Sequence, residues 1–219
     1  MRVALGLILL GACSSTSPVQ LTRSPPPTIV TSAPPPPTTA TTLSHGPVLI
    51  RYRIEVHTAD AATAEFASVV DATLRDPRGW RQAGFIMQRT DDAPYTVLLA
   101  EGAEVQQRCR PYDTYGRYSC QLGPLVAITA DRWRAATPEW TGDLATYRQE
   151  LVNHEVGHLL GLHHRKCPAQ GQPAPVMAQQ STNLDGCRPN PWPLPVEIER
   201  AARHDLRLAP PYERDTVDQ

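Results

Sequence analysis

The spacing of apolar residues predicts a strand and then a helix at the start of the folded part of the chain. Residues 48–56 are rich in β-branched side chains and alternate apolar with polar positions over their second half, which predicts a strand. Residues 61–74 place apolar side chains at helical spacing, with Asp60 as a candidate N-cap. The segment Asp-Pro-Arg-Gly-Trp at 76–80 should break this helix, because proline and glycine interrupt helices.

Short apolar runs separated by turn-forming residues predict a sheet beyond this helix. Gly123 and Pro124 lie between two such runs and should turn them into a hairpin. The order strand, helix and four strands predicts a mixed α+β fold. The four further strands are expected at residues 85–89, 95–100, 118–121 and 125–129.

The longest periodic segment, residues 142–160, predicts a long helix whose apolar stripe packs on the sheet. Gly157 lies inside it and costs about 1 kcal/mol relative to alanine, so we expect this glycine to pack closely against another backbone. Pro195 is well placed as the first residue of a last helix that ends near residue 206. We therefore expect two helices in the second half of the folded domain.

The N-terminal residues have the organisation of a bacterial lipoprotein. Residues 1–12 combine an early arginine, a short apolar run and small residues, as a signal peptide does. Leu-Gly-Ala-Cys ending at Cys13 resembles a lipobox, which implies cleavage before Cys13 and its acylation; an ordinary secretory signal is the alternative. Either interpretation predicts export, and the lipobox also predicts an anchor on the outer face of the cell membrane.

Composition separates a tether from the folded domain. Residues 13–47 are rich in serine, threonine and proline and lack apolar periodicity, so they should form an extended tether. We expect the domain at 48–210 and a flexible tail at 211–219. The formal net charge of -1 offers no basic surplus for nucleic acid. We expect the protein to act as a monomer that does not bind nucleic acid.

Four cysteines follow Cys13, and an even number in an exported protein is most simply two disulfides. Three pairings are possible. We favour the pairing of cysteines that are near in sequence, because each would close a short loop. These pairs are Cys109 with Cys120 and Cys167 with Cys187.

Residues 154–164 carry the candidate chemistry. His154 and His158 are four residues apart, so one helical face can present both imidazoles to a single metal ion. Gly161 allows the chain to leave the helix sharply and to bring back His164 as a third ligand. Glu155 follows the first ligand, where its carboxylate can act as general base on a metal-bound water. The pattern predicts a catalytic Zn²⁺ site.

The string His-Glu-x-x-His-x-x-Gly-x-x-His, followed by Pro-Val-Met-Ala at 175–178, resembles the metzincin clan of zinc endopeptidases and its Met-turn. The resemblance implies a twisted, mostly parallel sheet of about five strands with an antiparallel edge strand. A backing helix, a long active-site helix and a C-terminal subdomain with a helix complete that fold. It assigns Met177 to the apolar floor beneath the metal. Several metzincins carry a tyrosine two residues later, where this chain has Gln179.

The clan resemblance also implies how a peptide would bind. It places an extended substrate along an edge strand and assigns residues 178–186 to a pocket on the side of the product amine. A finer resemblance is to an uncharacterised family of exported actinobacterial metzincin-like proteins, carried by residues 76–80, 190–193 and the spacing of Cys167 and Cys187. The residues assigned to the substrate edge are Arg117, Tyr118 and Ser119.

These features predict an exported, membrane-tethered zinc metalloendopeptidase that hydrolyses peptides or proteins of the cell envelope. One alternative is a zinc-dependent amidase of cell-wall material, which only the location suggests. A second is a lipoprotein that holds zinc without catalysis. The intact Glu155 argues against this second alternative.

Overall fold

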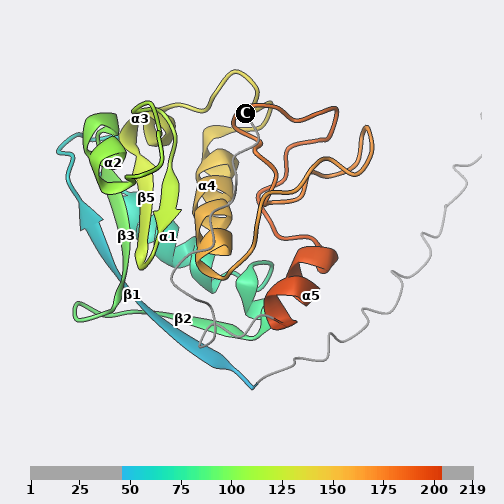
Figure 1. The fold of residues 1–219 in the computed structure, drawn as a ribbon, viewed down its shortest axis with the longest axis horizontal. Coiled ribbons are helices and arrows are strands. Elements are labelled where there is room, and N and C mark those ends of the chain that lie inside the picture. The colour runs from blue at the N-terminus through green and yellow to red at the C-terminus, as the bar shows by residue number, and fades with distance from the viewer. Residues whose placement is uncertain (1–45, 204–219) are drawn as a thin grey trace, which may run out of the picture. The chain divides into compact units, whose positions relative to one another are not determined.

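The structure is a computed structural model, and it describes residues 46–203 of the chain (Figure 1). The predicted signal peptide, the acylation site Cys13, nearly all of the tether and the C-terminal tail lie outside the described residues. Between residues 46 and 203, no helix is both long enough and apolar enough to cross a membrane.

The centre of the domain is a five-stranded sheet with the strand order β2-β1-β3-β5-β4. Four strands run parallel, and β4 pairs antiparallel with β5 at one edge. The predicted mixed α+β fold with a mostly parallel sheet and an antiparallel edge strand is therefore confirmed. The strands are β1 (Val48–Val56), β2 (Phe85–Arg89), β3 (Tyr95–Ala100), β4 (Cys120–Leu122) and β5 (Leu125–Thr129).

The edge strand β4 begins at Cys120, later than the sequence predicted. Arg117, Tyr118 and Ser119 precede it and form no strand, because the amides of Arg117 and Tyr118 bind the carbonyl of Thr114 in a tight turn. Tyr115 and Gly116 in this turn have left-handed backbone angles, with φ of 51° and 65°. The strand predicted at residues 118–121 therefore lies at Cys120–Leu122, and residues 117–119, which the resemblance assigned to a substrate edge, do not belong to a strand.

Within residues 46–203, five α-helices and one 3-10 helix accompany the sheet. Helix α1 begins at Phe66 rather than at Ala61, because Asp60 binds the amides of Ala62 and Thr63 at 2.9 and 3.1 Å and so closes a separate turn before the helix. The helices are α1 (Phe66–Arg75), η1 (Trp80–Ala83), α2 (Gly102–Arg108), α3 (Ala130–Arg134), α4 (Leu144–Leu159) and α5 (Pro195–Arg203). Pro195 is the first residue of α5 as predicted, and the expected end of that helix near residue 206 lies outside the described residues.

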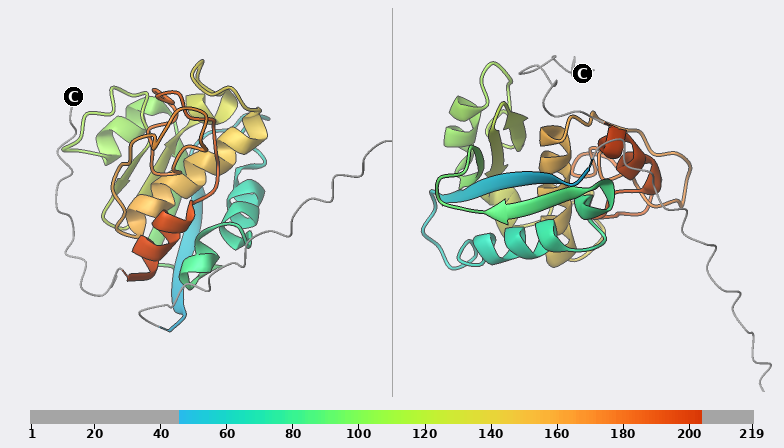
Figure 2. Two further views of the ribbon diagram at one scale, coloured as in Figure 1. Left: turned by 90° about the vertical axis from the view of Figure 1, so that its right-hand side faces the viewer. Right: turned by 90° about the horizontal axis from the view of Figure 1, so that it is seen from below.

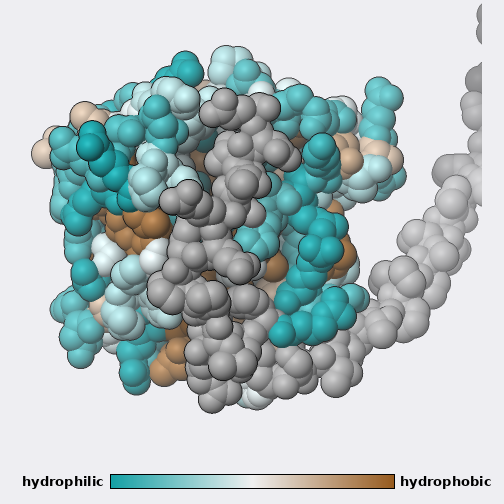
Figure 3. Space-filling view, in the orientation of Figure 1, coloured by the Kyte–Doolittle hydropathy of each residue, from teal (hydrophilic) through white to brown (hydrophobic). Residues whose placement is uncertain are grey.

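The sheet is covered on both faces (Figure 2). Side chains of α1 and α4 share the main apolar core with Ile50, Val97 and Ile128 of the sheet. A smaller cluster on the other face joins Val105 of α2 to Leu98 of β3. Figure 3 shows a mainly hydrophilic surface with small apolar patches. The long helix α4 is therefore fixed on the sheet from one side, as the predicted apolar stripe required.

Both favoured disulfides are present. Cys109, which follows α2, bonds to Cys120 at the start of β4, and Cys167 bonds to Cys187 in the loop that follows α4. The first disulfide ties α2 to the edge of the sheet. The sequence did not predict α2, because Val105 is its one buried residue and one apolar position makes no periodic pattern.

Candidate metal centre

Helix α4 has an N-cap at its start and a glycine turn at its end, and the turn leads the chain back towards His164. The side chain of Asp143 caps the N-terminus by accepting the amide of Thr146 at 2.7 Å. At the other end, Gly161 adopts φ 83°, and the amide of Leu162 binds the carbonyl of Gly157 at 3.0 Å. This left-handed turn reverses the chain towards His164, as predicted.

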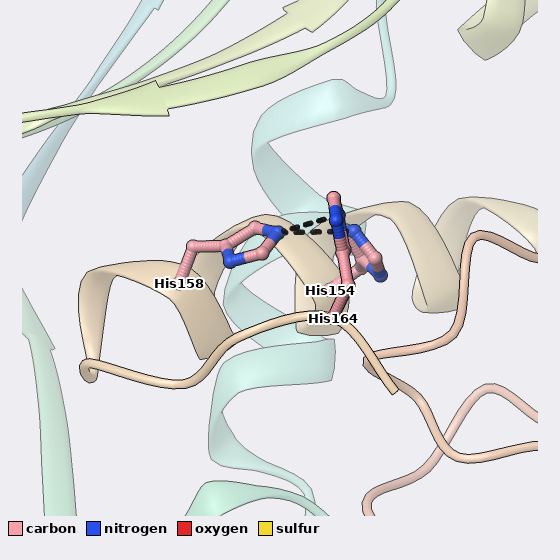
Figure 4. Close-up of side chains that lie close together, drawn as sticks. All are labelled: His154, His158 and His164. Atoms are coloured by element: carbon pink, nitrogen blue, oxygen red, sulfur yellow. Dashed lines mark hydrogen bonds between the residues drawn. The ribbon is translucent and has the colours of Figure 1, made fainter. Parts of the chain in front are cut away.

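Three histidines converge at the C-terminal half of α4 (Figure 4). The Nε2 atom of His158 lies 3.2 Å from the Nε2 atom of His154 and 3.2 Å from that of His164. His163, the neighbour of the third histidine, is exposed and does not belong to this group. The three side chains that could hold a metal ion are therefore the three that the sequence predicted.

The hydrogen bonds of the imidazoles fit a bound cation. Nδ1 of His154 lies 2.8 Å from the carbonyl oxygen of Val176, and Nδ1 of His158 lies 2.8 Å from that of Leu162. A carbonyl only accepts, so each Nδ1 carries the proton, and the Nε2 atom of each neutral ring holds a lone pair. Lone pairs 3.2 Å apart repel one another unless a cation lies between them.

The spacing of the nitrogen atoms also fits a metal. Tetrahedral zinc with bonds of about 2.0–2.1 Å would hold its ligand nitrogens roughly 3.3–3.4 Å apart. The observed separations of 3.2 Å are close to this value. Burial and the neighbouring His158 and His164 lower the pKa of His154 well below its ordinary value, which favours the neutral form that binds metals.

Glu155 is a buried carboxyl group next to the first histidine of the site. Burial raises its pKa from 4.5 to about 8, and the charge of Arg132 on α3 opposes this rise. A dipositive ion at the three histidines would also favour the ionised form. Its pKa near neutrality suits Glu155 to accept and return a proton.

Sequence reasoning missed a second buried carboxyl group, Glu150. Its Oε1 atom lies 3.8 Å from Nδ1 of His154, and its Oε2 atom has no hydrogen-bond partner within the described part of the chain. Burial and then the charge of Glu155 raise the pKa of Glu150 well above its ordinary value. The spacing of four between Glu150 and His154, which puts both on one helical face, is the signal that would have found it.

Met177 lies directly against α4. A Cβ atom at Gly157 would lie 2.3 Å from Sδ of Met177 and 2.9 Å from Cζ2 of Trp80. We expected Gly157 to pack against a backbone, but it packs against two large side chains. Both are buried, so the floor of this part of the helix is apolar and close-packed.

The two segments that carried the finer resemblance meet at the same turn of α4. The guanidinium of Arg78 lies 4.2 Å from the ring centre of Trp192. The indole of Trp80 donates to the carbonyl of Asn153 at 3.1 Å, and the amide side chain of Asn153 donates to the carbonyl of Pro191 at 2.8 Å. These contacts fix the helix just before His154.

The loop beyond the third histidine returns to this helix. The amide of Arg165 binds the carbonyl of Met177 at 2.9 Å, and the side chain of Gln180 binds the carbonyls of Pro175 and Asn190 at 3.2 and 2.8 Å. Gln180 is fully buried, whereas Gln179 is exposed. Gln179, two residues after Met177, thus lies at the surface of the loop.

Residues 35–187 of the chain match the model of a family described as "Protein of unknown function (DUF3152)". No curated protein matches the sequence. The matched segment includes the three histidines, Glu155 and Met177.

Proposed function

We propose that this chain, which belongs to the DUF3152 family of unknown function, is an exported zinc metalloendopeptidase of the metzincin type. One observation carries the proposal. The Nε2 atom of His158 lies 3.2 Å from those of both His154 and His164, on the helix that also carries the buried carboxyl group of Glu155. The hydrogen bonds of His154 and His158 through Nδ1 leave their Nε2 lone pairs free for a metal.

The set of ligands favours zinc in a catalytic role. Structural zinc sites have four protein ligands, whereas catalytic sites commonly have three and leave one position open. Three neutral imidazoles and no thiolate make up this site. When bound here, zinc would act as a Lewis acid that lowers the pKa of water and polarises a substrate carbonyl.

The residues of the chain would orient the site and move the proton. The carbonyls of Val176 and Leu162 hold His154 and His158 in the tautomer that binds a metal. Glu155 would take a proton from the attacking water and deliver it to the departing amine. Burial raises its pKa to about 8 in the metal-free chain, and a dipositive ion at the three histidines would favour the ionised form that a general base requires.

An extended peptide would bind along β4. Strand β4 pairs only with β5 among the described strands, so its other side is available for pairing with a substrate. The contact of α4 with β4 places this edge beside the helix that carries Glu155. The loop at residues 178–186 would contribute to the pocket on the side of the product amine.

The location of the substrate follows from export. Two disulfides indicate an oxidising compartment. With acylation of Cys13, the domain would lie at the outer face of the cell membrane, held by the proline-rich tether. We therefore propose peptides or proteins of the cell envelope as substrates.

The metal content of the purified chain tests the site. The unmodified protein should contain one zinc ion per chain by mass spectrometry of the metal, and His164→Ala should lose it. His163→Ala, its neighbour, is the matched control and should keep the zinc. Loss of zinc from the control alone would move the third ligand to His163.

Turnover of a mixed peptide library tests the chemistry. The unmodified chain should cleave peptides, and Glu155→Gln should retain zinc but lose activity by roughly 10²-fold or more, the effect of removing a general base. Zinc in both proteins, with no peptide cleavage by the unmodified chain, would favour a lipoprotein that holds zinc without catalysis. Release of amines from cell wall, without peptide cleavage, would favour an amidase.

A further inference from the structure

Glu197 of α5 is a buried carboxylate that binds the backbone of the Met-turn. Its side chain is almost fully buried, with 1% of its surface exposed. Its Oε1 atom accepts the amide of Met177 at 2.9 Å, and its Oε2 atom accepts the amides of Val176 and Leu194 at 3.0 and 2.8 Å. Burial raises the pKa of Glu197 above its ordinary value, and the three N–H donors oppose this rise because they favour the ionised form.

One of these donors belongs to a peptide group that also binds the candidate metal site. The peptide group between Val176 and Met177 accepts the Nδ1–H of His154 through its oxygen at 2.8 Å. The same group donates its N–H to Glu197 at 2.9 Å. A carboxylate, a peptide group and an imidazole therefore form a continuous chain of hydrogen bonds that ends at Nε2 of His154.

The cap of helix α5 does not explain this arrangement. The bond from the amide of Leu194 to Glu197 is an ordinary contact at a helix N-terminus, where a glutamate in the first turn reaches back to the cap residue. Such a cap can stay exposed. The two bonds to Val176 and Met177 are made by a buried carboxyl group, and its backbone donors together with the charge of Arg165 offset only part of the cost of that burial.

A carboxylate that binds a ligand histidine fixes the orientation of the ring and raises its basicity. Hydrogen bonds in a chain polarise one another, so a peptide group can transmit this effect. We propose that Glu197 is a positioning residue for the metal centre, acting on His154 through the Val176–Met177 peptide group. This proposal rests on the proposed function, because it takes the three histidines as metal ligands.

Metal affinity of the full chain tests the proposal. Glu197→Gln has the same shape but replaces one acceptor oxygen with a donor that faces an N–H. It should weaken Zn²⁺ binding about 10–100-fold in competition with a chelator, the usual cost of losing such a partner. It should also shift the visible absorption of bound Co²⁺. Glu199→Gln, on the exposed side of α5, is the matched control and should change neither.

The outcomes separate this proposal from the proposed function. Equal Zn²⁺ affinity and equal Co²⁺ absorption in a folded Glu197→Gln protein would overturn the role of Glu197 and leave the proposed function standing. Zinc binding by the unmodified chain without peptide cleavage would contradict the proposed function alone. An unmodified chain that binds no metal would contradict both.

A second measurement needs no variant at this position and applies even where Glu197→Gln fails to fold. Zinc added to the unmodified chain should slow the hydrogen exchange of the Met177 amide, because a metal on His154 strengthens the chain of hydrogen bonds. Exchange at Met177 that is fast, or that is the same with and without zinc, would overturn the proposal.

Discussion

The sulfur of Met177 lies so close to Gly157 that a Cβ atom on the glycine would be 2.3 Å from it. Trp80 closes the same space from another side, with its Cζ2 atom at 2.9 Å from that position. Gly157 immediately precedes His158, so this contact sets how closely α4, with its candidate ligands, packs on Met177 and Trp80.

Gly157→Ala should destabilise the protein although alanine favours helices by about 1 kcal/mol. Met177 and Trp80 are buried and have little room to move, so the added methyl group should cost about 1–3 kcal/mol in overpacking. We expect a net loss in the free energy of unfolding and weaker zinc binding. Chemical denaturation and a chelator competition would measure the two effects.

The double variant Gly157→Ala/Met177→Ala is the control for this mechanism. Met177→Ala alone should cost about 2–5 kcal/mol because it leaves a cavity. In the double variant, the methyl group of alanine at position 157 would enter the space that the sulfur of Met177 has left. The double variant should therefore be more stable than the sum of the two single effects predicts. Strict additivity would show that the two residues do not compete for one space.

Glu155→Gln should change how the stability of the metal-free chain depends on pH. Burial raises the pKa of Glu155 from 4.5 to about 8, so between these values the folded chain holds a proton that the unfolded chain releases. The contribution of Glu155 to the free energy of unfolding is therefore fully present below pH 4.5 and is lost as pH rises through about 8. The loss is at most about 1.4 kcal/mol per pH unit.

The comparison of the two proteins reports on Glu155 together with its coupling to Glu150, whose pKa the charge of Glu155 raises. The lowered pKa of His154 changes the free energy of unfolding with pH in the opposite direction to Glu155. The raised pKa of Glu150 changes it in the same direction. Both residues remain in the variant. With a chelator present, the stability of Glu155→Gln relative to the unmodified chain should increase as pH rises through this window. A constant difference in unfolding free energy would mean that Glu155 is already ionised in the folded chain.

The parts of the fold that the sequence predicted are those in which local pattern and tertiary structure agree. Strands β1, β2, β3 and β5 alternate or run apolar because both faces of the sheet are covered. The three histidines were predictable because helical spacing and one glycine turn bring them together without any distant contact. The disulfide partners were near in sequence, so short loops favoured the correct pairing.

The parts that the sequence did not reveal depend on distant contacts. The spacing to His154 placed Glu150 on the face of the ligands, but glutamate is usually solvated, and only packing with other elements shows that Glu150 and Glu197 are buried. Pro195 predicted the start of α5, but not the bonds from Glu197 to the amides of Val176 and Met177. Helix α2 lacked a pattern because it presents one apolar residue to the sheet.

Replacement of Cys167 and Cys187 by serine should weaken zinc binding as well as stability. The disulfide joins residues separated by 20 positions, and closing such a loop stabilises by about 3 kcal/mol in the chain-entropy description. Cys167 follows closely after His164, so without the disulfide the third histidine would be held less firmly. Thermal unfolding and zinc titration should both change, and unchanged zinc affinity would show that α4 alone positions His164.

Replacement of Cys109 and Cys120 by serine should separate substrate binding from metal binding. This disulfide joins residues 11 positions apart, so the loss of stability should again be about 3 kcal/mol. Cys120 is the first residue of β4, the strand proposed to pair with the peptide. Cys109 and Cys120 pack in a different apolar cluster from Cys167 and Cys187, which follow His164 in the chain. We therefore expect KM for a cleaved peptide to rise while zinc affinity stays the same. Zinc affinity could instead fall as much as in the variant that lacks Cys167 and Cys187. That result would mean that the edge of the sheet supports the candidate metal centre and that β4 has no separate role in holding substrate.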